Sequence, residues 1–210
     1  FFIIKTISEN LTYILTREVA MCGRLDIMSL PLSKKVSDTL NIQFLAADNR
    51  DLRPTQTVST ITSIDDSLQQ LDTSWGIKPN WAKKLLINAQ VETVSTKPTF
   101  KKAFTDNRCV IPCSGWYEWS SIAGDGKKKY LFESDNNSPL YMAGIYYPIP
   151  DTAPELVTLT TSPSSLCKQY HHRMPLLIPE IAVEDFLKLP VEDIGGLLVC
   201  SEDSLRVSVC

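Results

Sequence analysis

The sequence predicts a fold built on a mixed, largely antiparallel sheet or barrel. Many short segments are rich in β-branched and aromatic residues, and few helical segments separate them. Thirteen prolines against eight glycines indicate short elements with stiff connections. A parallel α/β fold would need a helix after most strands, and that alternation is absent from the sequence. The 210 residues, 43% of them hydrophobic, suffice for one domain with a sizeable core.

The strands are expected where β-branched and aromatic residues cluster between turn residues. Residues 106–119 hold two of them, a buried strand and a short aromatic strand. The full set of expected strand segments is 56–64, 69–77, 106–119, 127–134, 139–147 and 155–161.

Three segments are predicted to be helical. Residues 30–40 place Leu32, Val36 and Leu40 on one face. Residues 162–172 have Ser162 or Ser164 as the capping residue. Residues 179–190 are bounded by prolines, which favour helix ends.

Charge is unevenly distributed along a chain whose formal net charge is only −3. Between Trp75 and Arg108, seven basic residues stand against two acids. Such a segment is a candidate phosphate-facing surface, and a solvated face is the simpler alternative. The seven basic residues are Lys78, Lys83, Lys84, Lys97, Lys101, Lys102 and Arg108.

Cysteine and histidine usage argues against a metal centre or a disulfide framework. The six cysteines form no C-x-x-C pair, and the two histidines are adjacent. Most of the cysteines are expected to be small buried residues. No apolar run is long enough to cross a membrane. We therefore expect a cytoplasmic protein with no metal, no cofactor and no membrane attachment.

Four short stretches carry residues suited to chemistry. "MCGR" holds the thiol of Cys22, and residues 75–93 hold two tryptophans, several lysines and Asn88. "CSGWYEW" places Glu118 among aromatic residues, where desolvation would raise the pKa of its carboxyl. "YHHRMP" contains both histidines. Each stretch also has a structural alternative: a buried cysteine, a turn-capping Asn, a solvent-facing Glu or a hydrogen-bonding His.

Taken together, the motifs resemble one family. "MCGR", "PTQ", "WG-x-x-P-x-W", "INA-x-x-ET", "GWYEW" and "H-x-RMP" occur in this order between Met21 and Pro175. This set resembles the SOS response-associated peptidase (SRAP) family. The resemblance implies a compact α+β domain with a strongly curved, mostly antiparallel, barrel-like sheet and short flanking helices. It also implies a monomer that binds single-stranded DNA and captures abasic sites covalently.

The resemblance assigns roles by position. Cys22 would form the crosslink, Glu118 and His171 would act as acid and base, and Asn88 would position the N-terminal residue and the sugar. The residues implied to lie along the DNA are Gly23, Arg24, Pro54, Trp75, Trp81, Lys83, Gln90 and Arg173.

Crosslinking chemistry at Cys22 would use the amine and the thiol of the same residue. An α-amine with a pKa of about 8 is partly neutral at pH 7 and can attack the aldehyde of an opened abasic sugar. The thiol then closes a thiazolidine ring, and both groups react as one intramolecular unit. Residues 1–21 would block that amine, so we expect them to be upstream or removable sequence before a single domain of residues 22–210.

Two further departures from the family pattern bear on function. Gln90 stands where the family usually has Arg, which removes one charge from a phosphate contact. The chain stops at "LRVSVC", where family members commonly continue, as a truncated C-terminus would explain. Two alternative functions stay open: a cysteine-dependent peptidase that removes its own leader, and a non-catalytic module that binds single-stranded DNA.

Overall fold

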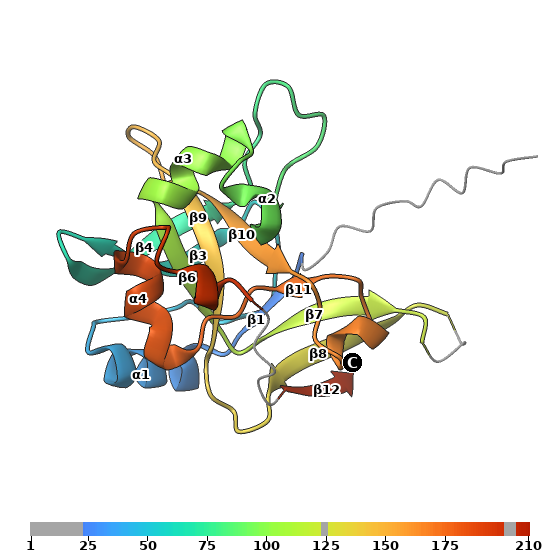
Figure 1. The fold of residues 1–210 in the computed structure, drawn as a ribbon. Coiled ribbons are helices and arrows are strands. Elements are labelled where there is room, and N and C mark those ends of the chain that lie inside the picture. Colours follow the sequence, from blue (N-terminus) through green and yellow to red (C-terminus); the bar gives the residue numbers. More distant parts are fainter. Residues whose placement is uncertain (1–22, 123–125, 200–204) are drawn as a thin grey trace, which may run out of the picture.

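A computed structural model describes residues 23–122, 126–199 and 205–210 (Figure 1). The expected leader, residues 1–21, and Cys22 lie outside these described residues. Two β-sheets form the body of the molecule, and short helices lie around them.

The first sheet has the strand order β12-β8-β7-β1-β2, and its neighbouring strands are antiparallel. Strand β7 lies at its centre: β8 pairs along its whole length, and β1 pairs with its first two residues, Gly115 and Trp116. The strands are β1 (Leu25–Ile27), β2 (Asn49–Leu52), β7 (Gly115–Ser120), β8 (Lys128–Ser134) and β12 (Leu205–Val209).

The second sheet closes on itself. Strand β10 pairs with β4, β4 with β3, β3 with β6, β6 with β9, and β9 again with β10. This closed ring confirms the predicted barrel-like core, and among the described strands only the pairings of β10 with β4 and β5 are parallel. The strands are β3 (Thr57–Ile64), β4 (Ser67–Trp75), β5 (Asn88–Gln90), β6 (Arg108–Cys113), β9 (Leu140–Tyr147), β10 (Glu155–Thr161) and β11 (Met174–Pro175).

Local sequence explains the best-defined of these strands. Every residue of β6 is buried, as its continuous apolar run requires for a strand covered on both sides. The β3–β4 hairpin turns at Asp65 and Asp66, whose φ angles are 49° and 59°. Two left-handed residues match the twist of a two-residue hairpin, and Asp tolerates this conformation better than most residues.

The helices are short and cover the closed sheet. Helix α1 (Ser29–Leu40) contacts β6, α3 (Pro98–Asp106) contacts β9 and β6, and α4 (Val183–Lys188) contacts β6 and β3. Helix α2 (Val91–Val94) directly follows β5. Short 3₁₀ turns span Cys167–Gln169, Glu180–Ala182 and Gly195–Leu197. Among the described residues, none of the helices is long and apolar enough to traverse a bilayer.

One predicted helix is wrong. Of residues 162–172, only Cys167–Gln169 form a helical turn, and it is a 3₁₀ turn. The residue that caps this turn is Leu166, not Ser162 or Ser164, although the Ser164 Oγ accepts a hydrogen bond from the Cys167 backbone nitrogen at 3.2 Å. The buried side chain of Cys167 anchors the turn, after which the chain extends toward β11.

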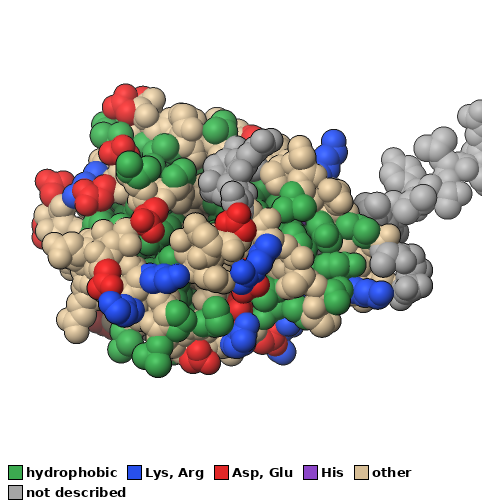
Figure 2. All heavy atoms as spheres, turned by 90° about the horizontal axis from the view of Figure 1, so that it is seen from below, with side chains coloured by type: hydrophobic (Ala, Val, Ile, Leu, Met, Phe, Trp, Pro, Cys, Tyr) green, Lys and Arg blue, Asp and Glu red, His purple; other side chains and the backbone are tan. Residues whose placement is uncertain are grey.

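The surface seen from below in Figure 2 mixes all side-chain types. Acidic and basic side chains are interspersed there with exposed hydrophobic ones. This is the character of an ordinary solvated surface.

Arg108 joins two helices to the barrel and is itself buried, although the sequence placed it in the basic segment. Its Nε donates to Phe186 O at 2.7 Å, and its Nη1 donates to Phe104 O at 3.0 Å. Its Nη2 donates to Leu189 O. Carbonyls at the ends of α3 and α4 lack helical partners, so one guanidinium satisfies the C-terminal ends of both helices.

We expect Arg108→Met to lower the free energy of unfolding by about 2–4 kcal/mol, because it leaves buried carbonyls without donors. Urea denaturation followed by tryptophan fluorescence measures this loss. Lys102→Met on the exposed face of α3 is the control and should cost less than about 0.5 kcal/mol. Equal losses for the two variants would contradict the role given to Arg108.

Candidate functional site

Asn88 is held at the start of β5 by the neighbouring strand β10. Asn88 is paired in parallel with Thr158, and Gln90 with Thr160. The Thr158 hydroxyl lies within hydrogen-bond distance of Ile87 O, at 3.0 Å, and of Asn88 Oδ1. These contacts fix the Asn88 amide at the edge of the barrel, while Gln90 is exposed.

Trp75 supports this strand from inside the core. Its side chain is fully buried, and its Nε1 donates to Ile87 O at 3.3 Å. The expectation that Trp75 lies along DNA is therefore wrong for this structure, because a buried indole has no face free for a base. Its position at the end of β4 makes it a core residue that ties β4 to the beginning of β5.

The loop between β4 and β5 projects from the barrel (Figure 1). Gly76 begins it with a φ angle of 114°, and a Cβ there would lie 2.5 Å from Leu85 Cδ2. Only glycine fits such a turn. The loop carries Trp81, whose side chain is 68% exposed, beside the exposed Lys83. An exposed indole beside lysines is suited to stacking on a base, as the sequence predicted for these two residues.

Glu118 lies on the face of β7 that carries an aromatic cluster. Only 4% of Glu118 is exposed. Its register partner on β8 is Tyr130, so both side chains are on the same face. The Tyr130 ring meets the Tyr170 ring edge-on, with centroids 4.8 Å apart. Tyr170 directly precedes His171. The contact between Tyr130 and Tyr170 therefore joins the face of β7 that carries Glu118 to the segment that carries His171.

His171 is half-buried beside an open hollow lined by Ser162, Pro163, Lys168, Tyr170 and His172. Its Nδ1 lies 3.1 Å from the Arg173 backbone nitrogen and 3.2 Å from the Arg173 carbonyl oxygen. Neutral Nδ1 accepts from the N–H, and protonated Nδ1 donates to the carbonyl. The ring can therefore change its protonation state without losing its anchor.

Arg173 is engaged within the protein. Its Nη1 and Nη2 each lie 2.6 Å from a carboxylate oxygen of Glu92, and Nη2 also donates to Thr160 O at 2.7 Å. The hydrogen bonds from Arg173 lower the pKa of the Glu92 carboxyl. This bidentate pair fastens α2 to the segment that carries His171. A phosphate contact by Arg173, which the sequence led us to expect, would have to compete with Glu92.

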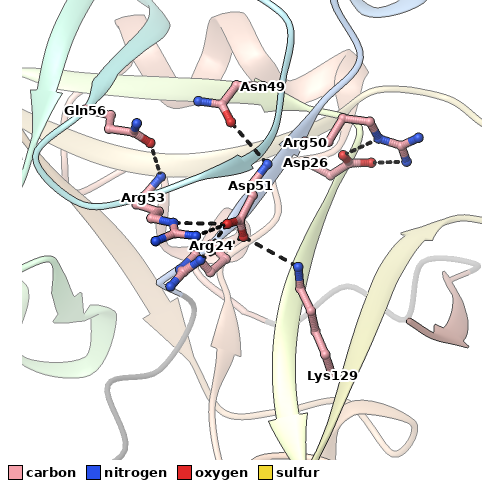
Figure 3. A network of polar contacts seen from close by, with 8 residues as sticks. All are labelled: Arg24, Asp26, Asn49, Arg50, Asp51, Arg53, Gln56 and Lys129. Atoms are coloured by element: carbon pink, nitrogen blue, oxygen red, sulfur yellow. Dashed lines mark hydrogen bonds and ion pairs between the residues drawn. The ribbon is translucent and has the colours of Figure 1, made fainter.

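Arg24 belongs to a network that the sequence did not predict (Figure 3). Three cationic side chains, Arg24, Arg53 and Lys129, point toward the single carboxylate of Asp51. The N···O distances to Asp51 are 2.8 Å for Arg24, 2.5 Å for Arg53 and 3.5 Å for Lys129. Hydrogen bonds from Arg53 and Arg24 lower the pKa of the Asp51 carboxyl to about 2. Asp51 is thus ionised throughout the physiological range.

The described chain begins at Gly23, close to Ile87, the residue before Asn88. A Cβ added to Gly23 would lie 3.5 Å from Ile87 Cδ1. The register of β1 with β7 pairs Leu25 with Trp116, and Tyr117 N donates to Arg24 O at 3.0 Å. Continued to Gly23, this antiparallel register sets Gly23 opposite Glu118. The residue before Gly23 is Cys22, which lies outside the described residues.

The remaining residues considered from the sequence are Pro54, the cysteines and the possible metal ligands. Pro54 is partly exposed in the turn between β2 and β3. Cys109 and Cys113 are buried free thiols, Cys167 is also buried, and Cys210 is an exposed free thiol. Burial raises the pKa of the Cys109 and Cys113 thiols well above the usual range, so neither is a nucleophile. In the part of the chain that the structure describes, no three His, Cys, Asp or Glu residues are grouped to hold a metal ion.

Comparison with known proteins decides the family. The model of the family described as "SOS response associated peptidase (SRAP)" matches residues 21–203. The chain belongs to the SRAP family. This confirms the resemblance drawn from the motifs.

Three relatives are 27–29% identical to this chain over the residues that align with it. The abasic site processing protein YoqW of Bacillus subtilis is 29% identical over 181 residues, which cover 80% of each chain. The abasic site processing protein YedK of Escherichia coli is 28% identical over 150 residues, which are 70% of this chain and 66% of YedK. The abasic site processing protein HMCES of Gallus gallus is 27% identical over 169 residues, 63% of this chain and 50% of its own.

Solved structures share the fold. A crystal structure of a protein from Bordetella bronchiseptica superposes with a TM-score of 0.78 at 21% identity, covering 90% of this chain and 99% of that one. One from Bacteroides thetaiotaomicron gives a TM-score of 0.72 at 23% identity, covering 90% and 91%. At these identities the likeness shows the fold alone, and it confirms the expected α+β class.

For this SRAP chain we expect the pKa of His171 to lie below the ordinary value of 6.5. Burial lowers it first, and the positive charge of His172 when protonated lowers it further. An NMR titration of the imidazole protons measures the midpoint. In His172→Gln only one histidine remains, which assigns the signal, and its midpoint should move up toward 6.5. A His171 midpoint at or above 6.5 in the parent protein would contradict this account.

Proposed function

We propose that this protein captures abasic sites in single-stranded DNA through a covalent bond to Cys22, which shields the lesion. The placement of Gly23 carries the proposal. Gly23 lies against Ile87, the residue before Asn88, and the register of β1 with β7 continues from Gly23 to Glu118, which supports a reaction of Cys22 beside Asn88 and Glu118. The relatives YoqW, YedK and HMCES, all named abasic site processing proteins, support the same substrate.

The reaction needs both the amine and the thiol of Cys22. The amine adds to the aldehyde carbon of the ring-opened deoxyribose, and loss of water gives an imine. The thiol then adds across the C=N bond, with its proton passing to the nitrogen, and a five-membered thiazolidine results. The net change is aldehyde plus aminothiol giving thiazolidine plus water. In the 210-residue chain, the Cys22 nitrogen is bound in an amide to Met21 and cannot react this way.

The surrounding side chains have distinct roles in this proposal. Glu118 moves protons at the amine and the carbinolamine, since it is buried against the aromatic cluster and in register with Gly23. The Asn88 amide, fixed by Thr158, orients the amine and the sugar. His171 assists opening of the sugar ring, because its Nδ1 is anchored to the backbone in both protonation states. Trp81, Lys83 and Gln90 lie along the bound single-stranded DNA.

The decisive test uses protein that begins at Cys22. We expect it to give a shifted band on a denaturing gel after incubation with single-stranded DNA carrying one abasic site. The matched Cys22→Ser protein should give no stable band, because a hydroxyl does not trap the imine comparably. The full 210-residue chain should bind DNA without forming the stable adduct.

Other outcomes of the same experiment would replace the proposal. A protein that binds DNA but forms no adduct in any form would be a non-catalytic module. Intact-mass measurement on the 210-residue chain tests the autopeptidase alternative, which predicts spontaneous loss of residues 1–21 that Cys22→Ser abolishes.

We expect Glu118→Gln to slow adduct formation by roughly 10²-fold, the lower range for removing a general acid–base group. Single-turnover rates at saturating DNA measure this, and the affinity for intact DNA should change little. Glu184→Gln on the exposed side of α4 is the control and should react at the parent rate. If Glu118→Gln reacted as fast as that control, Glu118 would have no role in proton transfer.

A further inference from the structure

The network around Asp51 lies on the face of β7 opposite to Glu118. Successive strand residues point to opposite faces, so Tyr117 and Trp119 face away from the Glu118 side. Lys129 Nζ lies 3.7 Å from the centre of the Tyr117 ring, and Arg24 Cζ lies 5.6 Å from that of Trp119. Asp51 on β2 and Lys129 on β8 thus meet across β1 and β7, over these two rings.

The charges of this network do not balance. Among the described residues, Asp51 is the carboxylate to which Arg24, Arg53 and Lys129 are all ion-paired, so three positive charges converge on one negative charge. The neighbouring Arg50 does not change this excess of positive charge, because its own charge is balanced by the buried Asp26 with which it is ion-paired. The mutual repulsion of the three cations is offset only in part, and a second anion would relieve it.

The network is also open to a ligand. The Arg53 side chain is 57% exposed, and Arg24, Lys129 and Asp51 are each about a third exposed or somewhat less. Arg24 contacts Asp51 through Nη1, and Arg53 contacts it through Nε and Nη2. A guanidinium has five N–H donors, so both arginines retain donors for a further oxygen anion. The aromatic rings beneath hold Arg24 and Lys129 in place.

We propose that Arg24, Arg53 and Lys129 form a phosphate site for the DNA backbone, in which a DNA phosphate competes with the Asp51 carboxylate for the three cations. The inference rests on the proposed function for the identity of its ligand. It adds Arg53, Lys129 and Asp51 to the site and extends the bound strand around β7. The bound DNA would pass from the Glu118 face of β7 to its Tyr117 face close to Gly23. It would do so there because Arg24, a member of the phosphate site, directly follows Gly23 in the chain.

The proposal makes Asp51 an internal competitor of the phosphate. Its removal should tighten DNA binding, whereas removal of Arg53 or Lys129 should weaken it. A network that served only to hold β2 against β8 would not give this opposite pair of effects. The two arginines and the lysine attract any strand equally, so the effects should not depend on an abasic lesion.

The test measures binding of the protein that begins at Cys22 to a fluorescent single strand without any lesion, over a range of salt concentrations. Arg53→Gln and Lys129→Met should each weaken binding roughly two- to fivefold at low salt. Each should also reduce the slope of log affinity against log salt by up to about 0.7, the value for one phosphate contact on a single strand. Asp51→Asn should tighten binding, and Lys188→Met, which removes an ion-paired lysine of α4, should leave it unchanged.

Two results would overturn the phosphate site. One is parent-like affinity and salt slope in both Arg53→Gln and Lys129→Met, with thermal unfolding showing both to be folded. The other is unchanged or weaker binding in a folded Asp51→Asn protein, which would contradict competition between the Asp51 carboxylate and a DNA phosphate for the three cations. Because the DNA has no lesion, failure here is separate from failure to crosslink an abasic site.

Discussion

Strand β10 is the constraint on which the rest of the structure depends. One of its edges accepts β4 at Glu155 and Leu156 and then β5 at Thr158–Thr160, while its other edge accepts β9 and β11. Those pairings close the barrel and also fix Asn88 and the end of the segment that carries His171, which leads into β11. Buried threonines at 158 and 160 serve both purposes, since their hydroxyls bond to the backbone of β5.

Strand β7 divides the chemistry of the other sheet between its two faces. One face carries Glu118 among aromatic rings, with little exposure to water, as proton transfer requires. The other carries Tyr117 and Trp119 beneath a cluster of cations. The alternation of a single strand thus places Glu118 and the cluster of Arg24, Arg53 and Lys129 on opposite faces of β7. Gly23 and Arg24 directly precede β1, the strand that pairs with the beginning of β7.

The sequence predicted what depends on local pattern and missed what depends on distant contacts. The strands were recognisable because β-branched and aromatic residues cluster in them, and motif order identified the family. The burial of Trp75 could not be predicted from the sequence, because an indole is equally suited to a hydrophobic core and to a DNA-binding surface. Arg108 donates a hydrogen bond to α4, and Asp51 is ion-paired with Lys129. Each contact joins residues about eighty positions apart, so no local sequence pattern predicts it. Residues 162–172 have a helical composition, yet the buried Cys167 anchors only one turn.

The loop after Trp75 has a consequence for how such proteins diverge. Ile77 and Leu86 exchange two backbone hydrogen bonds, of 3.0 Å and 2.9 Å, so residues 78–85 form an excursion that is closed at its base. Both ends are anchored to the barrel independently of what lies between them. Insertions and replacements within 78–85 can therefore reshape the surface around Trp81 without shifting the register of β5. The loop of residues 78–85 can therefore change its surface, while strand β5 keeps Asn88 in place.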